Sequence, residues 1–159
     1  MKALIVYDSV FGNTEKIARS VAAALNAPAL PVSQVQAETL RGLDVLIVGS
    51  PTRGFRPTEQ VTKFLNALPR EQLAGMKVAA FDTRIALETI GSKALRFMVD
   101  KGGYAANTIA RALVKKGGKM DIPPAGFLVT GEEGPLKEGE LERAADWARG
   151  LIISDRTWE

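Results

Sequence analysis

Residues 3–16 read ALIVYDSVFGNTEK, and this stretch decides the expected fold. The apolar run at 3–8 has the length and composition of a buried strand. Residues 14–26 then place Ile17, Val21 and Leu25 on one helical face. Only a short polar loop separates the two. A strand that leads through such a loop directly into an amphipathic helix predicts a sheet covered by helices.

The loop at residues 9–13 has two interpretations. In the first, Ser9 or Asn13 simply caps the helix. In the second, the loop holds an anion, because the first N–H groups of a helix lack partners and its dipole favours negative charge. Ser9, Asn13 and Thr14 would then add side-chain donors, and Gly12 would permit close backbone approach. The residues of this loop alone favour neither interpretation, and they match neither the GxxxxGK nor the GxGxxG phosphate motif.

Further apolar runs alternate with helical patterns along the chain. Strands are predicted at 30–35, 44–50, 77–82 and 126–131, in addition to 3–8. Helical spacing is found at 14–26, 37–42, 58–68, about 88–116 and 138–152. Because the strands are apolar throughout, helices are expected on both faces of a parallel, doubly wound sheet. Ligands of such sheets bind outside the carboxyl ends of the strands, so the loops after Asp8, Gly49 and Asp82 are the candidate site.

Composition limits the chemistry of this site. The 159 residues include no cysteine and no histidine. Disulfides, thiolate nucleophiles and cysteine-based metal sites are therefore excluded, and the most common general base and transition-metal ligand is missing. Any redox or group-transfer chemistry is expected to come from a bound cofactor. No metal site is predicted.

Charge and hydropathy indicate which partners and which cellular location are expected for the protein. The net charge is +3, and the basic residues are spread along the chain rather than clustered, so no nucleic-acid partner is predicted. The excess of positive charge has two interpretations, a basic face for an acidic protein partner and an ordinary solvated surface. No apolar run approaches the roughly 20 residues of a membrane span, and the start of the chain lacks the pattern of a signal peptide. A cytoplasmic protein without membrane insertion is expected.

Several stretches together resemble the flavodoxin family. Residues 9–16, SVFGNTEK, are similar to the loop that holds the phosphate of flavin mononucleotide (FMN) in that family. Residues 44–55, DVLIVGSPTRGF, resemble its third strand and first flavin loop, and 77–84, KVAAFDTR, its fourth strand and second flavin loop. Residues 126–151 resemble its last strand and helix. The resemblance covers the whole chain and implies one α/β domain over 1–159, with a five-stranded parallel sheet of order 2-1-3-4-5 in three α/β/α layers.

The resemblance also implies a set of cofactor-binding residues and no catalytic residue. They are Ser9, Phe11, Gly12, Asn13 and Thr14 in the first loop, Ser50, Pro51, Thr52, Arg53, Gly54 and Phe55 in the second, and Asp82, Thr83 and Arg84 in the third. In the second loop, Thr52 and Arg53 offer donors to a flavin and Phe55 an aromatic face. The alternative for this loop is a helix entry with Thr58 as the N-cap.

Two departures from the family pattern bear on the site. Phe11 stands where the family usually has a second hydroxyl, so only its backbone N–H could serve a phosphate. At Asp82, Thr83 and Arg84 the family's usual aromatic residue over the outer flavin face is missing. Residues 85–102 form a predicted helical insertion near that edge. It is interpreted either as additional core or self-association surface, or as a lid over the flavin.

The function implied by the resemblance is electron transfer between redox partner proteins, one of them possibly acidic, by an FMN-binding protein. One alternative is an NAD(P)H-dependent FMN or quinone oxidoreductase, which the missing aromatic residue favours because it leaves a flavin face open. A flavodoxin-like binding module that has lost FMN is another alternative. A receiver-like phospho-acceptor is disfavoured, because Gly49-Ser50-Pro51 occupies the place of its second aspartate.

Overall fold

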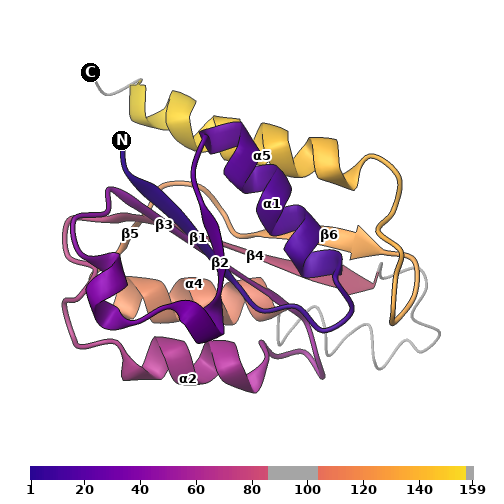
Figure 1. Ribbon diagram of the computed structural model, residues 1–159, viewed down its shortest axis with the longest axis horizontal. Helices are drawn as coiled ribbons and strands as arrows, with labels where there is room; N and C mark the ends of the chain where they lie inside the picture. Colours follow the sequence, from indigo (N-terminus) through magenta and orange to yellow (C-terminus); the bar gives the residue numbers. More distant parts are fainter. Residues whose placement is uncertain (86–103, 157–159) are drawn as a thin grey trace.

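The computed structural model describes residues 1–85 and 104–156, and a parallel sheet with helices on both faces forms its centre (Figure 1). The strands are β1 (Ala3–Tyr7), β2 (Ala29–Pro31), β3 (Val45–Pro51), β4 (Lys77–Ile85), β5 (Lys119–Met120) and β6 (Ala125–Val129). The helices are α1 (Asn13–Leu25), α2 (Glu59–Ala67), α4 (Ala105–Lys115) and α5 (Glu140–Arg156), with 3-10 turns at Val32–Gln34 and Ala37–Leu40. The predicted parallel sheet of order 2-1-3-4-5 is confirmed.

The fifth position of the sheet consists of two segments. β5 pairs with Lys77 and Val78 of β4, and β6 pairs with the end of the same strand, from Phe81 to Ile85. Pro123 and Pro124 lie between the two segments. Proline has no N–H to donate to a strand ladder, so the strand is interrupted there. The prediction of one strand at 126–131 missed β5, whose two residues are too short for a recognisable pattern.

Two strands end three or more residues away from the predicted position. The strand expected at 30–35 ends at Pro31 and continues as a 3-10 turn. The strand expected at 77–82 extends to Ile85, so Thr83 and Arg84 lie in β4 and not in a loop. The sequence did not predict this extension, because residues 82–84 are polar and polar residues are unusual in a buried strand. They are accommodated because β6 supplies backbone partners as far as Ile85, and Asp82 and Arg84 form an ion pair on one face of the strand.

The predicted helix boundaries agree closely with the structure for α1 and α2. Thr58 is the N-cap of α2, as the helix-entry interpretation of the second loop expected, and its hydroxyl accepts a hydrogen bond from the N–H of Val61 at 3.3 Å. The helical stretch predicted at 88–116 is observed as α4 from Ala105. Its earlier part, and the helical insertion predicted at about 85–102, lie outside the described residues, except that Ile85 ends β4.

The sheet divides two apolar cores, because alternate residues of each strand point to opposite faces. Leu4, Val6 and Leu46 pack with α2 and α4, whereas Ile5, Ile47 and Phe81 pack with α1 and α5. Figure 1 shows α1 and α5 on one side of the strands and α2 and α4 on the other. Both faces of the central strands are therefore buried, which explains their continuous apolar sequences.

Glu140 joins α5 to the outer edge of the sheet. It is 6% exposed, and its carboxylate accepts the N–H of Leu128 in β6 at 2.6 Å and two hydrogen bonds from Arg143. The guanidinium of Arg143 also lies 4.6 Å from the centroid of the Phe127 ring. The Arg143 hydrogen bond, helped by the Leu128 N–H, lowers the pKa of Glu140 although its burial opposes the shift. The ionised carboxylate thus stabilises the fold.

Replacement of Glu140 with glutamine should lower the free energy of unfolding at neutral pH by about 1.5–3 kcal/mol, the range for hydrogen bonds to charged groups. Because the pKa of Glu140 is lowered in the folded state, its contribution is complete above the unfolded value of about 4.3 and is lost as the pH falls through the folded pKa. Urea unfolding across pH 3–7 measures the difference. The gap between the two proteins should narrow in acid, and Glu142→Gln, an exposed change in the same helical turn, should show neither effect.

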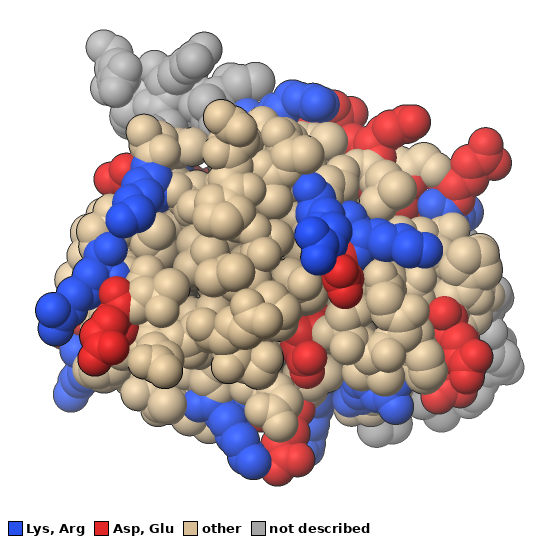
Figure 2. Space-filling model, in the orientation of Figure 1, with Lys and Arg blue, Asp and Glu red and all other residues tan. Residues whose placement is uncertain are grey.

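The charged surface carries both signs interspersed. On the face shown in Figure 2, Lys and Arg side chains alternate with Asp and Glu side chains around a wide area of uncharged residues. Three of the surface pairs form ion pairs within one helix: Arg19 with Glu15, Lys63 with Glu59, and Arg149 with Asp146. Exposed pairs of this kind add little stability. Within the ranges 1–85 and 104–156, none of the helices combines the length and the apolar character that crossing a bilayer requires.

Candidate functional site

A cavity of about 320 Å³ opens at the carboxyl ends of β1, β3 and β4, where the strand order reverses. Its volume lies at the lower end of the range for small-molecule sites, roughly 300–1,000 Å³. All three predicted loops contribute to its wall. The lining residues are Val10, Phe11, Asn13, Thr14, Pro51, Thr52, Arg53, Gly54, Thr83, Arg84, Ile85, Val129 and Glu132. The structure therefore brings together segments that are more than 100 residues apart in sequence.

Most of the predicted site residues line this cavity, but Ser9, Gly12, Ser50, Phe55 and Asp82 do not. Sequence reasoning missed a fourth segment, the loop after β6, which contributes Glu132. One signal could have identified it. The sequence GEEG at 131–134 directly follows the last predicted strand, whose carboxyl end must lie at the same edge of a parallel sheet as the other three.

The first loop leaves several backbone donors without acceptors. Gly12 is the N-cap residue of α1 with φ 92°, and no side chain caps this helix from that position. The Ser9 hydroxyl instead accepts the N–H groups of Gly12 at 3.1 Å and Glu15 at 3.3 Å. Among the described residues, the N–H groups of residues 10, 11, 13 and 14 have no hydrogen-bond acceptor. Unpaired N–H groups at the start of a helix, all four of them belonging to cavity-lining residues, form a site suited to an anion.

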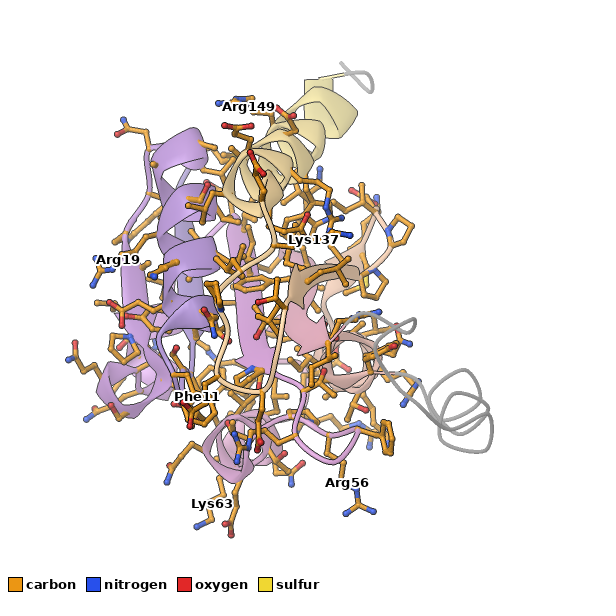
Figure 3. All side chains as sticks on the ribbon, turned by 90° about the vertical axis from the view of Figure 1, so that its right-hand side faces the viewer. Phe11, Arg19, Arg56, Lys63, Lys137 and Arg149 are labelled. Atoms are coloured by element: carbon orange, nitrogen blue, oxygen red, sulfur yellow. The ribbon has the colours of Figure 1, made fainter. Side chains whose placement is uncertain are left out.

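Phe11 is an exposed residue of this loop that also lines the cavity. The side chain is 43% exposed, and the guanidinium of Arg53 lies 5.5 Å from the ring centroid. In Figure 3, Phe11 lies in the lower half of the view together with Arg56 and Lys63, far from Arg149 on α5. Because a phenylalanine side chain has no hydrogen-bond donor, the backbone N–H is the group of Phe11 that could bind a phosphate, and this role stays a prediction.

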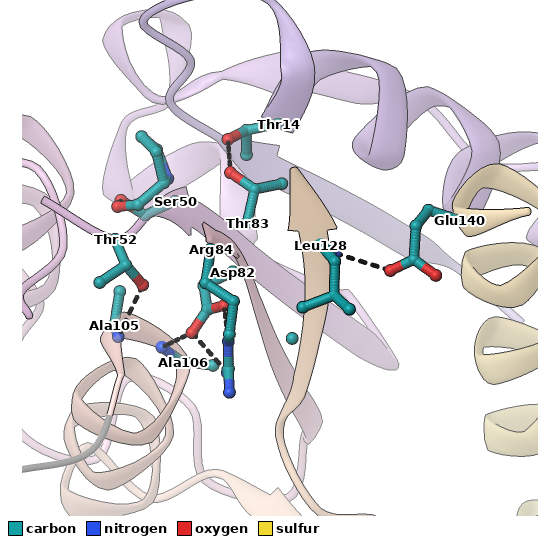
Figure 4. A network of polar contacts seen from close by, with 12 residues as sticks. Thr14, Ser50, Thr52, Asp82, Thr83, Arg84, Ala105, Ala106, Leu128 and Glu140 are labelled. Carbon is teal, nitrogen blue, oxygen red and sulfur yellow. Dashed lines mark hydrogen bonds and ion pairs between the residues drawn. The ribbon is translucent and has the colours of Figure 1, made fainter. Parts of the chain in front are cut away.

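Two buried hydroxyl groups meet beside the loop. The Oγ1 atoms of Thr14 on α1 and Thr83 on β4 are 2.8 Å apart, and the two residues are 1% and 4% exposed (Figure 4). Each hydroxyl has one hydrogen to donate. One hydrogen is used between the two oxygen atoms, so the other remains for a group in the cavity that both residues line. The extension of β4 thus gives Thr83 a position at the first loop.

The Asn13 side chain ties the first loop to the loop after β6. Its amide donates to the carbonyl oxygen of Glu133 at 3.1 Å. Gly134 has φ 104°, and a Cβ at that position would lie 2.7 Å from the Asn13 amide. A glycine is therefore required there for close approach. The predicted role of Asn13 as a side-chain donor to a phosphate competes with this contact, whereas its backbone N–H remains available.

The second loop contains a tight turn. The backbone groups of Arg53 and Arg56 are joined by two hydrogen bonds of 2.8 and 3.0 Å, and the residues between them, Gly54 and Phe55, both have positive φ. This is the pattern of a two-residue type I′ turn, in which a phenylalanine is rare. The turn directs Phe55 away from the cavity lining. Ser50 is fully buried, and its hydroxyl is bonded to Pro51 and Thr58 within the same loop.

The third group of residues forms a buried ionic network on β4 (Figure 4). The Asp82 carboxylate accepts hydrogen bonds from Arg84 at 2.7 and 2.8 Å and from the N–H of Ala106 at 2.9 Å. The Thr52 hydroxyl accepts the N–H of Ala105. Burial raises the pKa of Asp82, and Arg84, the Ala106 N–H and Thr52 oppose that rise. The start of α4 is thereby held against the ends of β3 and β4.

Solved structures of other proteins share this architecture. Oxidised flavodoxin 2 from Bacillus cereus superposes with a TM-score of 0.73 at 23% sequence identity, covering 96% of this chain and 99% of that one. The flavodoxin of Streptococcus pneumoniae gives 0.72 at 21% identity, with 96% and 99% covered. A WrbA-like flavodoxin from Agrobacterium tumefaciens gives 0.65 at 18% identity, with 98% of each chain covered. At these identities the similarity concerns the fold.

Family membership follows from the sequence match. A family model described as a flavodoxin domain matches residues 4–118. The matched range begins in β1 and extends to the residue before β5, so it includes the first loop, the second loop and the whole of β4. It therefore contains three of the four segments that surround the cavity. Because the match spans more than half of the chain, the protein belongs to the flavodoxin family, whose members are typically FMN-binding electron carriers.

Proposed function

We propose that this protein binds FMN in the cavity at the carboxyl ends of β1, β3 and β4 and carries electrons between redox partner proteins. The observation that carries the proposal is the set of unpaired N–H groups at the start of α1, beside a cavity that all three predicted loops line. FMN, when bound, supplies the electron-accepting and electron-donating chemistry, which a chain without cysteine or histidine does not itself provide.

The phosphate of FMN would be held at the first loop. The donors are the backbone N–H groups of residues 10, 11, 13 and 14 and the spare hydroxyl hydrogen of the Thr14–Thr83 pair. The dipole of α1 adds a partial positive charge at the same point. Ser9 and Gly12 act indirectly, because the Ser9 hydroxyl and the positive φ of Gly12 fix the path of the loop.

The flavin ring system would lie between the second loop and the end of β4. Pro51, Thr52, Arg53 and Gly54 provide one wall, and Thr83 and Arg84 provide another. Asp82 would support this wall through its hydrogen bonds with Arg84, and Ser50 through its bonds with Pro51 and Thr58, whereas Phe55 lies outside the cavity lining. The chain contributes binding, orientation and a local electrostatic field, and the partner protein would exchange electrons at the exposed mouth of the cavity.

The test of this proposal is FMN binding to the purified apoprotein, followed by flavin fluorescence. We expect a Kd of about 1 μM or lower, which corresponds to about 8 kcal/mol of binding free energy. Absence of binding at micromolar FMN would contradict the proposal and favour a flavodoxin-like module that has lost the cofactor. Riboflavin, which lacks the phosphate, serves as the matched probe for the contribution of the first loop.

Anaerobic mixing of the holoprotein with NADH or NADPH distinguishes a carrier from a reductase. A carrier without a nicotinamide site should be reduced slowly, and visible absorbance of the flavin records the rate. Rapid reduction by either nucleotide would instead identify an NAD(P)H-dependent oxidoreductase. Acidic and basic redox proteins offered as acceptors to the reduced holoprotein, over a range of salt concentrations, would then establish whether the net charge of +3 selects an acidic partner.

A further inference from the structure

Arg84 is held rigidly at the wall of the cavity. Its Nε and one Nη atom donate to Asp82 at 2.7 and 2.8 Å, and the guanidinium carbon lies 3.5 Å from the centroid of the Tyr104 ring. On a further side it packs against the backbone of Gly126, where an added Cβ would lie 2.1 Å from the guanidinium. An ion pair, an aromatic ring and a neighbouring strand thus fix the position of one positive charge.

The negative charge of Asp82 has a second partner besides Arg84. Its Oδ2 atom accepts the N–H of Ala106 in the first turn of α4, at 2.9 Å. The positive end of that helix dipole therefore shares in neutralising the carboxylate. Asp82 is fully buried and does not line the cavity, whereas Arg84 does. The Nη1 atom of Arg84 has no hydrogen-bond acceptor within the described segments. The member of this ion pair that lines the cavity is accordingly the cationic one.

We infer that Arg84 favours the reduced flavin over the oxidised flavin, an inference that rests on the proposed binding of FMN in this cavity. Full reduction of the ring system places negative charge on it at neutral pH, whereas the oxidised ring is neutral. A fixed positive charge at a partly desolvated wall therefore stabilises the reduced state more than the oxidised state. Arg84 sets the reduction potential through this difference and takes no part in electron transfer itself.

The proposed role of Arg84 can be distinguished by experiment from two simpler roles, phosphate binding and support of the fold. If Arg84 only bound the phosphate, which is charged in both redox states, its removal would weaken oxidised and reduced FMN equally and would leave riboflavin unaffected. If Arg84 only supported the fold, its removal would lower stability without a selective effect on reduced flavin. The ratio of the two dissociation constants, oxidised over reduced, is therefore the informative quantity, and it can be measured with either FMN or riboflavin.

The experiment compares the wild-type holoprotein with Arg84→Gln, Arg84→Lys and the control Arg56→Gln. Arg56 is exposed and lies outside the cavity lining, so its replacement removes the same charge from the surface. Redox titration gives the potentials, and fluorescence titration gives the Kd of oxidised flavin. In Arg84→Gln we expect the affinity for fully reduced flavin to fall about tenfold or more relative to the affinity for oxidised flavin, equivalent to a lowering of the two-electron midpoint potential by about 30 mV. The same shift should occur with riboflavin.

The controls define what overturns the inference. Arg84→Lys should retain most of the wild-type ratio, and Arg56→Gln should change it less than about twofold, since exposed charges are screened. If Arg84→Gln folds poorly, the double variant Asp82→Asn/Arg84→Met removes both charges and should shift the ratio in the same direction, because only Arg84 lines the cavity. An unchanged ratio in a variant that still binds FMN overturns the inference alone. Failure of the wild type to bind FMN overturns the proposed function as well.

Discussion

The double variant Thr14→Val/Thr83→Val should bind FMN about 10- to 100-fold more weakly than the wild type, with little change for riboflavin. The hydroxyl pair, 2.8 Å between oxygen atoms, retains one hydrogen for the phosphate. A hydrogen bond to a charged group contributes about 1.5–3 kcal/mol, and each 1.4 kcal/mol is a tenfold change in Kd. Fluorescence titration with the two flavins measures both affinities.

Variants of Thr14 and Thr83 also distinguish an effect on flavin binding from an effect on stability. Replacing both hydroxyls by methyl groups of similar shape should leave the unfolding free energy of the apoprotein within about 1 kcal/mol of the wild type. Either single variant leaves one buried hydroxyl without its partner and should be less stable than the double variant. Thr62→Val, on the exposed side of α2, is the control that should leave flavin affinity unchanged. Equal losses for FMN and riboflavin would contradict a phosphate site at the first loop.

Replacement of Phe81 with alanine should have the largest effect on stability, about 3–5 kcal/mol, as is usual for a buried aromatic residue. Phe81 is fully buried in the core beneath α1 and α5. Its ring meets Phe127 and Trp147 edge-to-face, with both centroid distances equal to 6.1 Å. Urea unfolding measures the loss. Leu141→Ala, at a position that is 44% exposed, should cost far less.

Gly49 provides a second test of the same contact. It pairs with Phe81 across β3 and β4, and a Cβ at position 49 would lie 2.1 Å from the Phe81 ring. Gly49→Ala should therefore destabilise the protein by about 1–3 kcal/mol through overpacking. The same change should cost less in a Phe81→Leu background, because the smaller side chain leaves room for the methyl group. Additive losses would indicate that the two residues do not interact.

The fold was largely predictable because its signals are local and repeated. Each central strand is a short apolar run, and α1 has one apolar stripe, so the alternation of strands and helices required a covered parallel sheet. Thr58 could be identified as an N-cap from its residue type and position. β5 was not predictable, because two residues carry no periodicity and their pairing with β4 is a tertiary effect.

The candidate site was predictable in its location and less so in its details. The loops met at one edge of the sheet because parallel strands all end there. Asp82 to Arg84 were interpreted as a loop, since polar residues are unusual in a buried strand. Their position in β4 depends on partners far away in sequence, Ala106 on α4 and Gly126 on β6. The contact of the Phe11 ring with Arg53 and the positive φ of Phe55 likewise depend on backbone geometry that residue types do not reveal.

The broken fifth position of the sheet has a consequence for how copies of this protein meet. An unpaired strand edge offers a row of N–H and C=O groups on which the backbone of another molecule can assemble. Here one outer edge is β2, three residues long and ending in Pro31, and the other is divided by Pro123 and Pro124 into β5 and β6. Part of the β6 edge is also covered by the Glu140 carboxylate. Both borders of the sheet thus have the short or interrupted strands that disfavour edge-to-edge pairing between copies of a protein.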